Sequence, residues 1–147
     1  MSTSSPVVRE FFERYERSRN TFDLDVIDSQ YPDAFMMAGP DGARVAEKQA
    51  ALAGLPKGQA LFKSVGHTST TLVSLEETRL DEYYAMAHAR FVWRFERAPA
   101  PAPPIDVDVD STFILYIRDG VAKIVFQHEH EDFLQALRAR GVLAAKP

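Results

Sequence analysis

The stretch from Val107 to His130 constrains the fold most, because it has the pattern of two strands joined by one tight turn. At its centre lies Asp119-Gly120, a residue pair that favours a two-residue type I′ turn, in which both central residues need a positive φ. If Arg118 and Val121 close this turn, counting outward from them fixes the register of both strands. The stretch is therefore predicted to form a β-hairpin.

The counted register predicts which side chains share a face of the hairpin, since side chains alternate along a strand. One face becomes an apolar floor that ends in two histidines. The other face carries Ile114, Tyr116 and Val125 and is predicted to meet solvent or a second subunit. The pairs expected on the first face are Ile117 with Ala122, Leu115 with Ile124, Phe113 with Phe126, Ser111 with His128, and Val109 with His130.

Upstream of the hairpin, the spacing of apolar residues changes from a helical period to a period of two. Ser5-Pro6 is typical of a helix start, and Val8, Phe11, Phe12 and Tyr15 follow on one face. Gly54 and Pro56 are predicted to stop a later helix. The expected helices are one of about three turns from residue 6, then 22–29, 46–55 with a further turn at 58–64, and a last one that Asp132 caps.

The expected strands are a short one at 33–38 with a brief return at 43–45, two long ones at 67–78 and 83–96, and the two of the hairpin. A run of proline and alanine at 98–104 is predicted to be a stiff connector of the polyproline type. Helices that come first, followed by mostly antiparallel strands, predict a single α+β domain over residues 1–147. One sheet must bury one face against helices.

Composition excludes several functional classes. The formal net charge is −4, and acidic and basic residues are interleaved along the chain. Nucleic-acid or anionic-membrane binding needs a clustered basic face, and the sequence contains none, so neither partner is expected. The chain has no cysteine and no apolar run long enough for a membrane span, so we expect a cytoplasmic protein. Phosphate-binding, dinucleotide-binding and zinc-protease motifs are absent from the sequence, and no cofactor or metal is expected.

Several short segments follow one another along the chain: Phe11-Phe12-x-x-Tyr15, Asp23-Leu24-Asp25, Tyr31-Pro-Asp-Ala-Phe35, Gly39-Pro-Asp-Gly42 and the terminal hairpin. Their order resembles the NTF2-like superfamily, and within it the SnoaL-like polyketide cyclase and ketosteroid isomerase relatives. The resemblance implies a cone-shaped, cystatin-like roll, with N-terminal helices packed on a curved, mostly antiparallel sheet. It also implies a pocket between helices and sheet, often a dimer, and roles that range from isomerase, dehydratase and cyclase to no known activity.

Two positions can be compared with the ketosteroid isomerases. Tyr15 falls where those enzymes place the tyrosine that hydrogen-bonds the substrate oxyanion. Gly39 occupies the position of their general-base aspartate. The resemblance therefore implies an oxyanion donor in this chain but supplies no base.

His128 and His130 are the first candidates for acid–base chemistry, because a histidine in a partly apolar cavity exchanges a proton near neutral pH. They could equally be rim residues that pair with Glu129, Glu131 or Asp132, and a metal site would lack a third ligand. Tyr15 could donate into the cavity or point to solvent. Asp33 could act as a base if it is buried beside His128, or accept hydrogen bonds in a turn.

Two hypotheses follow for the function. The first is a homodimeric protein whose cavity binds a small, mostly apolar molecule, with cofactor-free proton transfer by His128 of the dehydratase, isomerase or cyclase kind. The second is a non-catalytic ligand-binding or dimerisation module that uses the face of Tyr116 and Val125. Trp93 is expected in either the cavity or the core. The residues expected to line the pocket are Phe12, Tyr31, Phe35, Trp93, Ser111, Phe113 and Phe126.

Overall fold

The computed structural model describes residues 2–96 and 102–144. In chain order the elements are β1 (Ser2–Thr3), α1 (Pro6–Thr21), α2 (Leu24–Ser29), β2 (Ala34–Gly39), β3 (Gly42–Glu47), α3 (Lys48–Ser64), β4 (His67–Arg79), β5 (Tyr84–Phe95), β6 (Ile105–Arg118), β7 (Val121–Glu129) and α4 (Phe133–Ala139).

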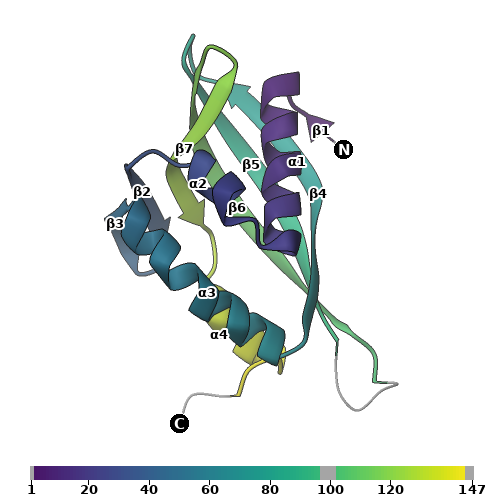
Figure 1. Cartoon of the computed structure of the whole chain (residues 1–147). Coiled ribbons are helices and arrows are strands. Elements are labelled where there is room, and N and C mark those ends of the chain that lie inside the picture. The colour runs from purple at the N-terminus through teal and green to yellow at the C-terminus, as the bar shows by residue number, and fades with distance from the viewer. Residues whose placement is uncertain (1, 97–101, 145–147) are drawn as a thin grey trace.

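One sheet carries the fold. Within the described residues it has seven strands in the order β1-β4-β5-β6-β7-β2-β3. The β1–β4 and β2–β7 pairs are parallel, and the other pairs are antiparallel. The sheet is strongly twisted and the helices gather on one of its faces (Figure 1). The predicted α+β class, with helices packed on a curved and mostly antiparallel sheet, is confirmed.

The N-terminal helix forms as its sequence predicts. Pro6 lies in the first turn of α1, and the apolar face with Phe12 and Tyr15 is buried. Phe22 takes a left-handed conformation (φ 54°) and ends α1, so α2 starts two residues later than predicted. The side chain of Asp23 caps α2 by accepting a hydrogen bond from the backbone N–H of Val26 at 3.2 Å.

The predicted break at Gly54 and Pro56 is wrong, because α3 continues through both residues to Ser64. Pro56 has no N–H to donate and lies between Gly54 and Gly58, which disfavour helix. The rest of α3 is rich in alanine, leucine, lysine and glutamine, and one missing bond does not end the element. The last turns are held by Phe62, whose ring lies 5.3 Å from that of Trp93. The helix therefore lies as one rod beside the sheet (Figure 1).

The core lies between α1 and the inward face of the middle strands. Alternate residues of β5 from Ala85 to Phe91 are buried there, as the alternation of small and aromatic residues at Ala85, Ala87, Ala89, Phe91, Trp93 and Phe95 predicts. Phe12 of α1 packs on Phe113 of β6, with ring centroids 5.0 Å apart. A smaller cluster around Leu137 attaches α4 to the far end of β5 and β6.

The predicted hairpin is present, and its turn is confirmed by the positive φ of Asp119 (54°) and Gly120 (76°). Pairing follows the prediction near the turn, through Leu115 with Ile124. A β-bulge follows, because β7 uses one more residue than β6 between the pair Leu115–Ile124 and the pair Ile114–Phe126.

The bulge overturns the pairing predicted beyond it. Phe113 faces Gln127 rather than Phe126, and Ser111 faces Glu129 rather than His128. Since side chains alternate along a strand, a shift of one residue exchanges the two faces. His128 and His130 therefore lie on the outer face, and Gln127 and Glu129 replace them on the inner one.

The remaining differences from the sequence prediction concern the chain start and the segment before β6. The strand β1 was not predicted, because two residues carry no periodicity. The connector predicted at 98–104 falls largely outside the described residues, and β6 begins just after it at Ile105. Among the helices of residues 2–96 and 102–144, none has the length and apolar character needed to cross a membrane.

Candidate ligand-binding site

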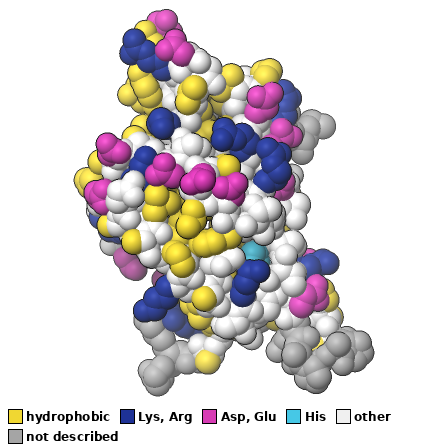
Figure 2. Space-filling view, viewed as in Figure 1, with side chains coloured by type: hydrophobic (Ala, Val, Ile, Leu, Met, Phe, Trp, Pro, Cys, Tyr) yellow, Lys and Arg dark blue, Asp and Glu magenta, His cyan; other side chains and the backbone are white. Residues whose placement is uncertain are grey.

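A cavity of about 1060 Å³ lies between the helices and the inner face of the sheet. Its walls come from all four helices of the described residues, from the β2–β3 hairpin, and from parts of β4, β5, β6 and β7. Hydrophobic side chains gather around the middle of this side of the molecule, with charged side chains around them (Figure 2). A space of this size suits one drug-sized ligand.

Aromatic rings form much of the apolar wall. At one side the rings of Tyr31 and Phe35 lie 4.5 Å apart. At the other side the ring centroid of Trp93 on β5 lies 4.7 Å from that of Phe133 on α4 and 5.3 Å from that of Phe62 on α3. These contacts join α3 and α4 to the sheet. The cavity is therefore bounded by rigid groups at both ends.

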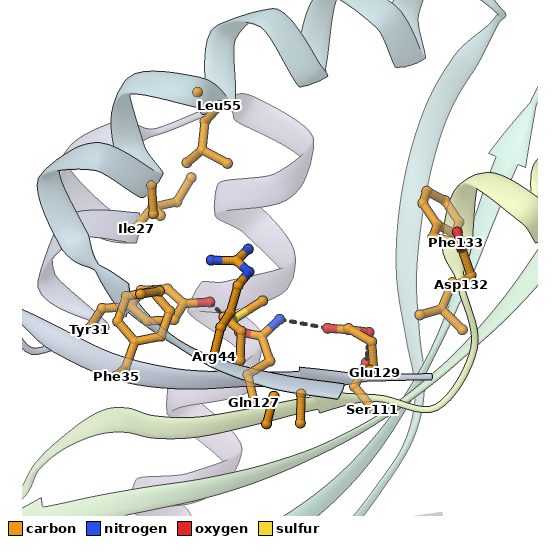
Figure 3. Close-up of a pocket in the computed structure, with 18 of the residues that line it drawn as sticks. Ile27, Tyr31, Phe35, Arg44, Leu55, Ser111, Gln127, Glu129, Asp132 and Phe133 are labelled. Carbon is orange, nitrogen blue, oxygen red and sulfur yellow. Dashed lines mark hydrogen bonds between the residues drawn. The ribbon is translucent and has the colours of Figure 1, made fainter. Parts of the chain in front are cut away.

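A line of hydrogen bonds crosses the floor of the cavity (Figure 3). The Tyr31 hydroxyl donates to Oε1 of Gln127 at 2.6 Å, and Nε2 of Gln127 donates to Oε1 of Glu129 at 2.6 Å. Oγ of Ser111 donates to Oε2 of Glu129 at 2.5 Å. Every bond runs toward the carboxylate, so the line holds Glu129 in one orientation as an acceptor.

The Tyr31 hydroxyl is a fixed donor in this line. Burial is the main cause that raises the pKa of this phenol, and the neighbouring Tyr15 adds to the rise. The group therefore keeps its proton throughout the neutral range.

Arg19 places a positive charge beside the two tyrosines. Its guanidinium carbon lies 4.0 Å from the centre of the Tyr15 ring, and its Nη2 lies 3.4 Å from the Tyr31 hydroxyl. Burial alone would lower the pKa of Arg19, but its interactions with Tyr15 and Tyr31 outweigh that effect and raise it. The side chain is therefore a cation that lines the cavity.

The structure brings some of the residues predicted from the sequence to this cavity and not others. Tyr15, Tyr31, Phe35, Trp93 and Ser111 line it. Phe12 and Phe113 are fully buried in the core instead, and do not line it. The side chain of Asp33 is fully exposed outside the cavity, 3.8 Å from Nζ of Lys48.

Phe126, His128 and His130 also lie away from the cavity. His130 hydrogen-bonds through Nε2 to Oγ1 of Thr112 at 2.7 Å, and its ring stacks on that of His128 at 4.4 Å. Both belong to the outer face, with His88, whose ring is 5.7 Å from that of His130. The catalytic role of these histidines stays a prediction, and it would have to concern a molecule bound on the outer face.

Several polar residues of the cavity were not identified from the sequence, among them Arg19, Arg44, Gln127 and Glu129. Arg19 had a signal, since it follows Tyr15 by four residues on the apolar stripe of α1 and so faces inward. Gln127 and Glu129 had none, because an unbroken alternation along the strand assigns them to the outer face. Across the described parts of the chain, no three His, Asp or Glu side chains are grouped so that they could hold a metal ion.

Comparison with known proteins places the chain by its structure. No family model matches the sequence, and no curated protein matches it. An NTF2-like protein of unknown function from Shewanella oneidensis is 20% identical, with a TM-score of 0.65, over 85% of this chain and 97% of the other.

Two further solved structures have the same arrangement. An NTF2-like protein with a cystatin-like fold from Novosphingobium aromaticivorans is 15% identical with a TM-score of 0.68, over 95% of this chain and 87% of its own. A candidate ketosteroid isomerase from Shewanella frigidimarina is 11% identical with a TM-score of 0.67, over 88% and 98%. Likeness at this level of identity concerns the fold, and this chain has the NTF2-like, cystatin-like fold.

Proposed function

We propose that the cavity binds a small, largely apolar ligand and that Glu129 exchanges a proton with it. The observation that carries the proposal is the carboxylate of Glu129, which lines an aromatic cavity and is held by Ser111 and Gln127. Such a fixed carboxylate is suited to take a proton from carbon or oxygen without a cofactor. The reaction type is that of a dehydratase, isomerase or cyclase.

The other polar groups of the cavity have supporting roles in this proposal. A proton that leaves the ligand leaves negative charge on it, and a nearby donor or cation stabilises that charge. Tyr15 and Arg19 line the same cavity and are in contact with each other. Their place beside the aromatic wall suits a ligand oxygen, while the ligand body packs on Tyr31 and Phe35. The Shewanella frigidimarina protein of the same fold is a candidate ketosteroid isomerase, which is an activity of the same reaction type.

The test begins with a thermal-shift screen of small aromatic, steroid-like and polyketide-like compounds that carry a carbonyl or hydroxyl group. A ligand at about a hundredfold its Kd adds roughly 2.7 kcal/mol to the stability of the folded state. Each hit is then incubated in D2O with the protein, and deuterium entry at carbon is followed by NMR. The wild type should catalyse the exchange, and Glu129→Gln should slow it by at least about tenfold.

The matched control is His128→Phe, a change on the outer face of the same strand. It should leave the exchange rate close to that of the wild type. If His128→Phe abolishes exchange while Glu129→Gln preserves it, Glu129 is not the base, and a histidine on the outer face is. Hits without exchange in any variant would leave a binding cavity but no proton transfer.

A second candidate function, association with another copy of the chain, is favoured by the outer face of the sheet. In the described part of the chain the helices lie on the opposite side (Figure 1). The outer face carries partly exposed apolar and aromatic side chains at the centre of the sheet, and Tyr84 and Tyr116 lie 5.3 Å apart there. The side chains that follow them in register are Met86, Ile114 and Phe126. We propose a homodimer through this face.

The dimer is tested by placing a charge in this patch. Phe126→Asp should convert the dimer to monomer in sedimentation-equilibrium measurements, because an aspartate at the centre of an apolar interface is buried without a partner. Leu61→Asp is the control, since Leu61 is an exposed apolar residue on α3. Dissociation by Leu61→Asp but not by Phe126→Asp, or a monomeric wild type, contradicts the proposed interface.

A further inference from the structure

The charges around the cavity are not matched with one another. Arg19 is partly buried, yet no carboxylate of the described residues lies within ion-pair distance of it. Its hydrogen-bond partners are neutral hydroxyls: Ser18 Oγ at 3.5 Å and Tyr31 at 3.4 Å, both at the long limit, and Tyr15. A guanidinium has five N–H donors, so part of its capacity is unused.

Local structure offsets only part of the free-energy cost of burying the unpaired Arg19 cation. Arg19 belongs to the last turn of α1, where the partial negative charge of the helix end favours a cation. The Tyr15 ring below the guanidinium adds a cation–π contact. Neither replaces the bidentate partner that a planar guanidinium accepts best, which is a carboxylate or phosphate.

A second guanidinium lines the same cavity. Arg44 rises from β3, and its guanidinium points into the space between the helices and the floor (Figure 3). No ion pair is formed by Arg44 among the described residues. Lys48 differs, because Asp28 at 3.4 Å and Asp33 at 3.8 Å already balance it.

Five carboxylates line the cavity, and neutral donors occupy three of them. Glu129 accepts from Ser111 and Gln127. Glu47 accepts from two backbone N–H groups at the start of α3, and Asp132 does so from one at the start of α4. The other two carboxylates of the cavity, Asp41 and Glu131, are exposed and form no ion pair among the described residues. Arg19 and the solvent-exposed Arg44 thus line the cavity without a carboxylate from the described part of the chain within ion-pair distance.

We infer that the ligand of this cavity is a monocarboxylate with an apolar body, and that its carboxylate pairs with Arg19, with Arg44 as the second contact. This inference rests on the proposed function and names the class of its ligand. The carboxylate lies against Arg19, the apolar body packs on Tyr31, Phe35 and Trp93, and the part of the ligand that exchanges a proton lies at Glu129. A phosphate-bearing ligand shares the anionic chemistry, but the aromatic walls favour the smaller and less hydrated carboxylate.

The test compares two probes of the same shape, 3-phenylpropionate and 3-phenylpropan-1-ol, by isothermal titration calorimetry. The wild type should bind the carboxylate at least about tenfold more tightly than the alcohol, because only the carboxylate can pair with Arg19. Arg19→Met should remove that preference, because it weakens binding of the carboxylate far more than binding of the alcohol. Arg19→Lys should restore part of it, since a lysine keeps the charge but loses the planar fork. Inorganic phosphate is titrated in parallel.

The stability of the free protein separates a binding role from a structural one. If Arg19 serves ligand binding and does not stabilise the free protein, Arg19→Met should have a Tm equal to or above that of the wild type, because an unpaired cation has been removed. A clear fall in Tm would make Arg19 a structural residue and overturn the inference, and Arg44→Met then tests the anion preference without that complication.

Each binding outcome decides one question. Equal affinity for the acid and the alcohol overturns the carboxylate inference and leaves the proposed cavity function intact. Tighter binding of phosphate than of 3-phenylpropionate also overturns it, in favour of a phosphate-bearing ligand. No binding of either organic probe, by a protein with a native circular dichroism spectrum, counts against both this inference and the proposed function.

Discussion

Replacing Phe113 with alanine is expected to lower the free energy of unfolding by about 3 to 5 kcal/mol. Phe113 is fully buried between the sheet and α1, where its ring lies 5.0 Å from that of Phe12 and 5.7 Å from that of Tyr15. Truncation removes buried apolar surface and leaves a void that rings on a helix and a sheet cannot fill by a small shift. Urea denaturation followed by circular dichroism measures the loss.

The matched control is Phe126→Ala, on the neighbouring strand. The register predicted from an unbroken hairpin places Phe126 opposite Phe113 on one apolar face. In the structure Phe126 is opposite Ile114 on the outer face and keeps partial exposure. Its truncation should therefore cost less than about 2 kcal/mol in the monomer. Equal losses for the two variants would contradict the bulge and restore the register counted from the turn.

Much of the fold could be predicted because its signals are local. A type I′ turn requires positive φ values that few residue pairs other than Asp119-Gly120 accept. This pair therefore identified the two turn residues of the hairpin correctly. The alternation from Ala85 to Phe95 identified the inward face of β5, because small and aromatic residues on one side mark a sheet packed on a helix. The short motifs added the NTF2-like resemblance, which the solved structures bear out as a fold.

The bulge in β7 could not be predicted by the same reasoning. Val125 and Phe126 are both apolar, so the pattern Ala122, Ile124, Phe126 continues across the bulge without an interruption. A bulge is favoured by how the strand twists and packs against its neighbours, here the parallel partner β2, and that information is not local. One undetected residue was enough to assign His128 to the cavity and Glu129 to the outer face.

The partners of charged residues were also beyond local patterns. The helical period could place Arg19 on the inward stripe of α1, but it could not identify its partners. Arg19 meets the Tyr31 hydroxyl only through the packing of the fold, and Tyr31 in turn donates to Gln127 on β7. The pattern could therefore predict a pocket with aromatic walls, but not the charge that the pocket presents to its ligand.

Replacing Gly66 with alanine is expected to destabilise the protein by at least about 2 kcal/mol. Gly66 joins α3 to β4 with a φ of 99°, a value that side-chain-bearing residues rarely adopt. A Cβ at this position would overlap the backbone carbonyl oxygen of Glu96, and a backbone atom cannot move aside as a flexible side chain can. The carbonyl of Gly66 also accepts a hydrogen bond from the N–H of Glu96 at 2.8 Å, which ties β4 to β5. Thermal and urea unfolding of the variant measure the loss.

Gly54→Ala provides a control of opposite sign. Gly54 lies inside α3, has no positive φ, and a Cβ there would meet no atom within 4 Å. Alanine should therefore stabilise the helix by about 0.5 to 1 kcal/mol, because it restricts the unfolded chain and favours helix. The pair of variants tests two features of α3 at once, its continuity through Gly54 and the tight turn that ends it. A loss of stability in Gly54→Ala would mean that α3 is interrupted there, as local propensity predicts, and a tolerated Gly66→Ala would mean that the turn into β4 is wider than the structure shows.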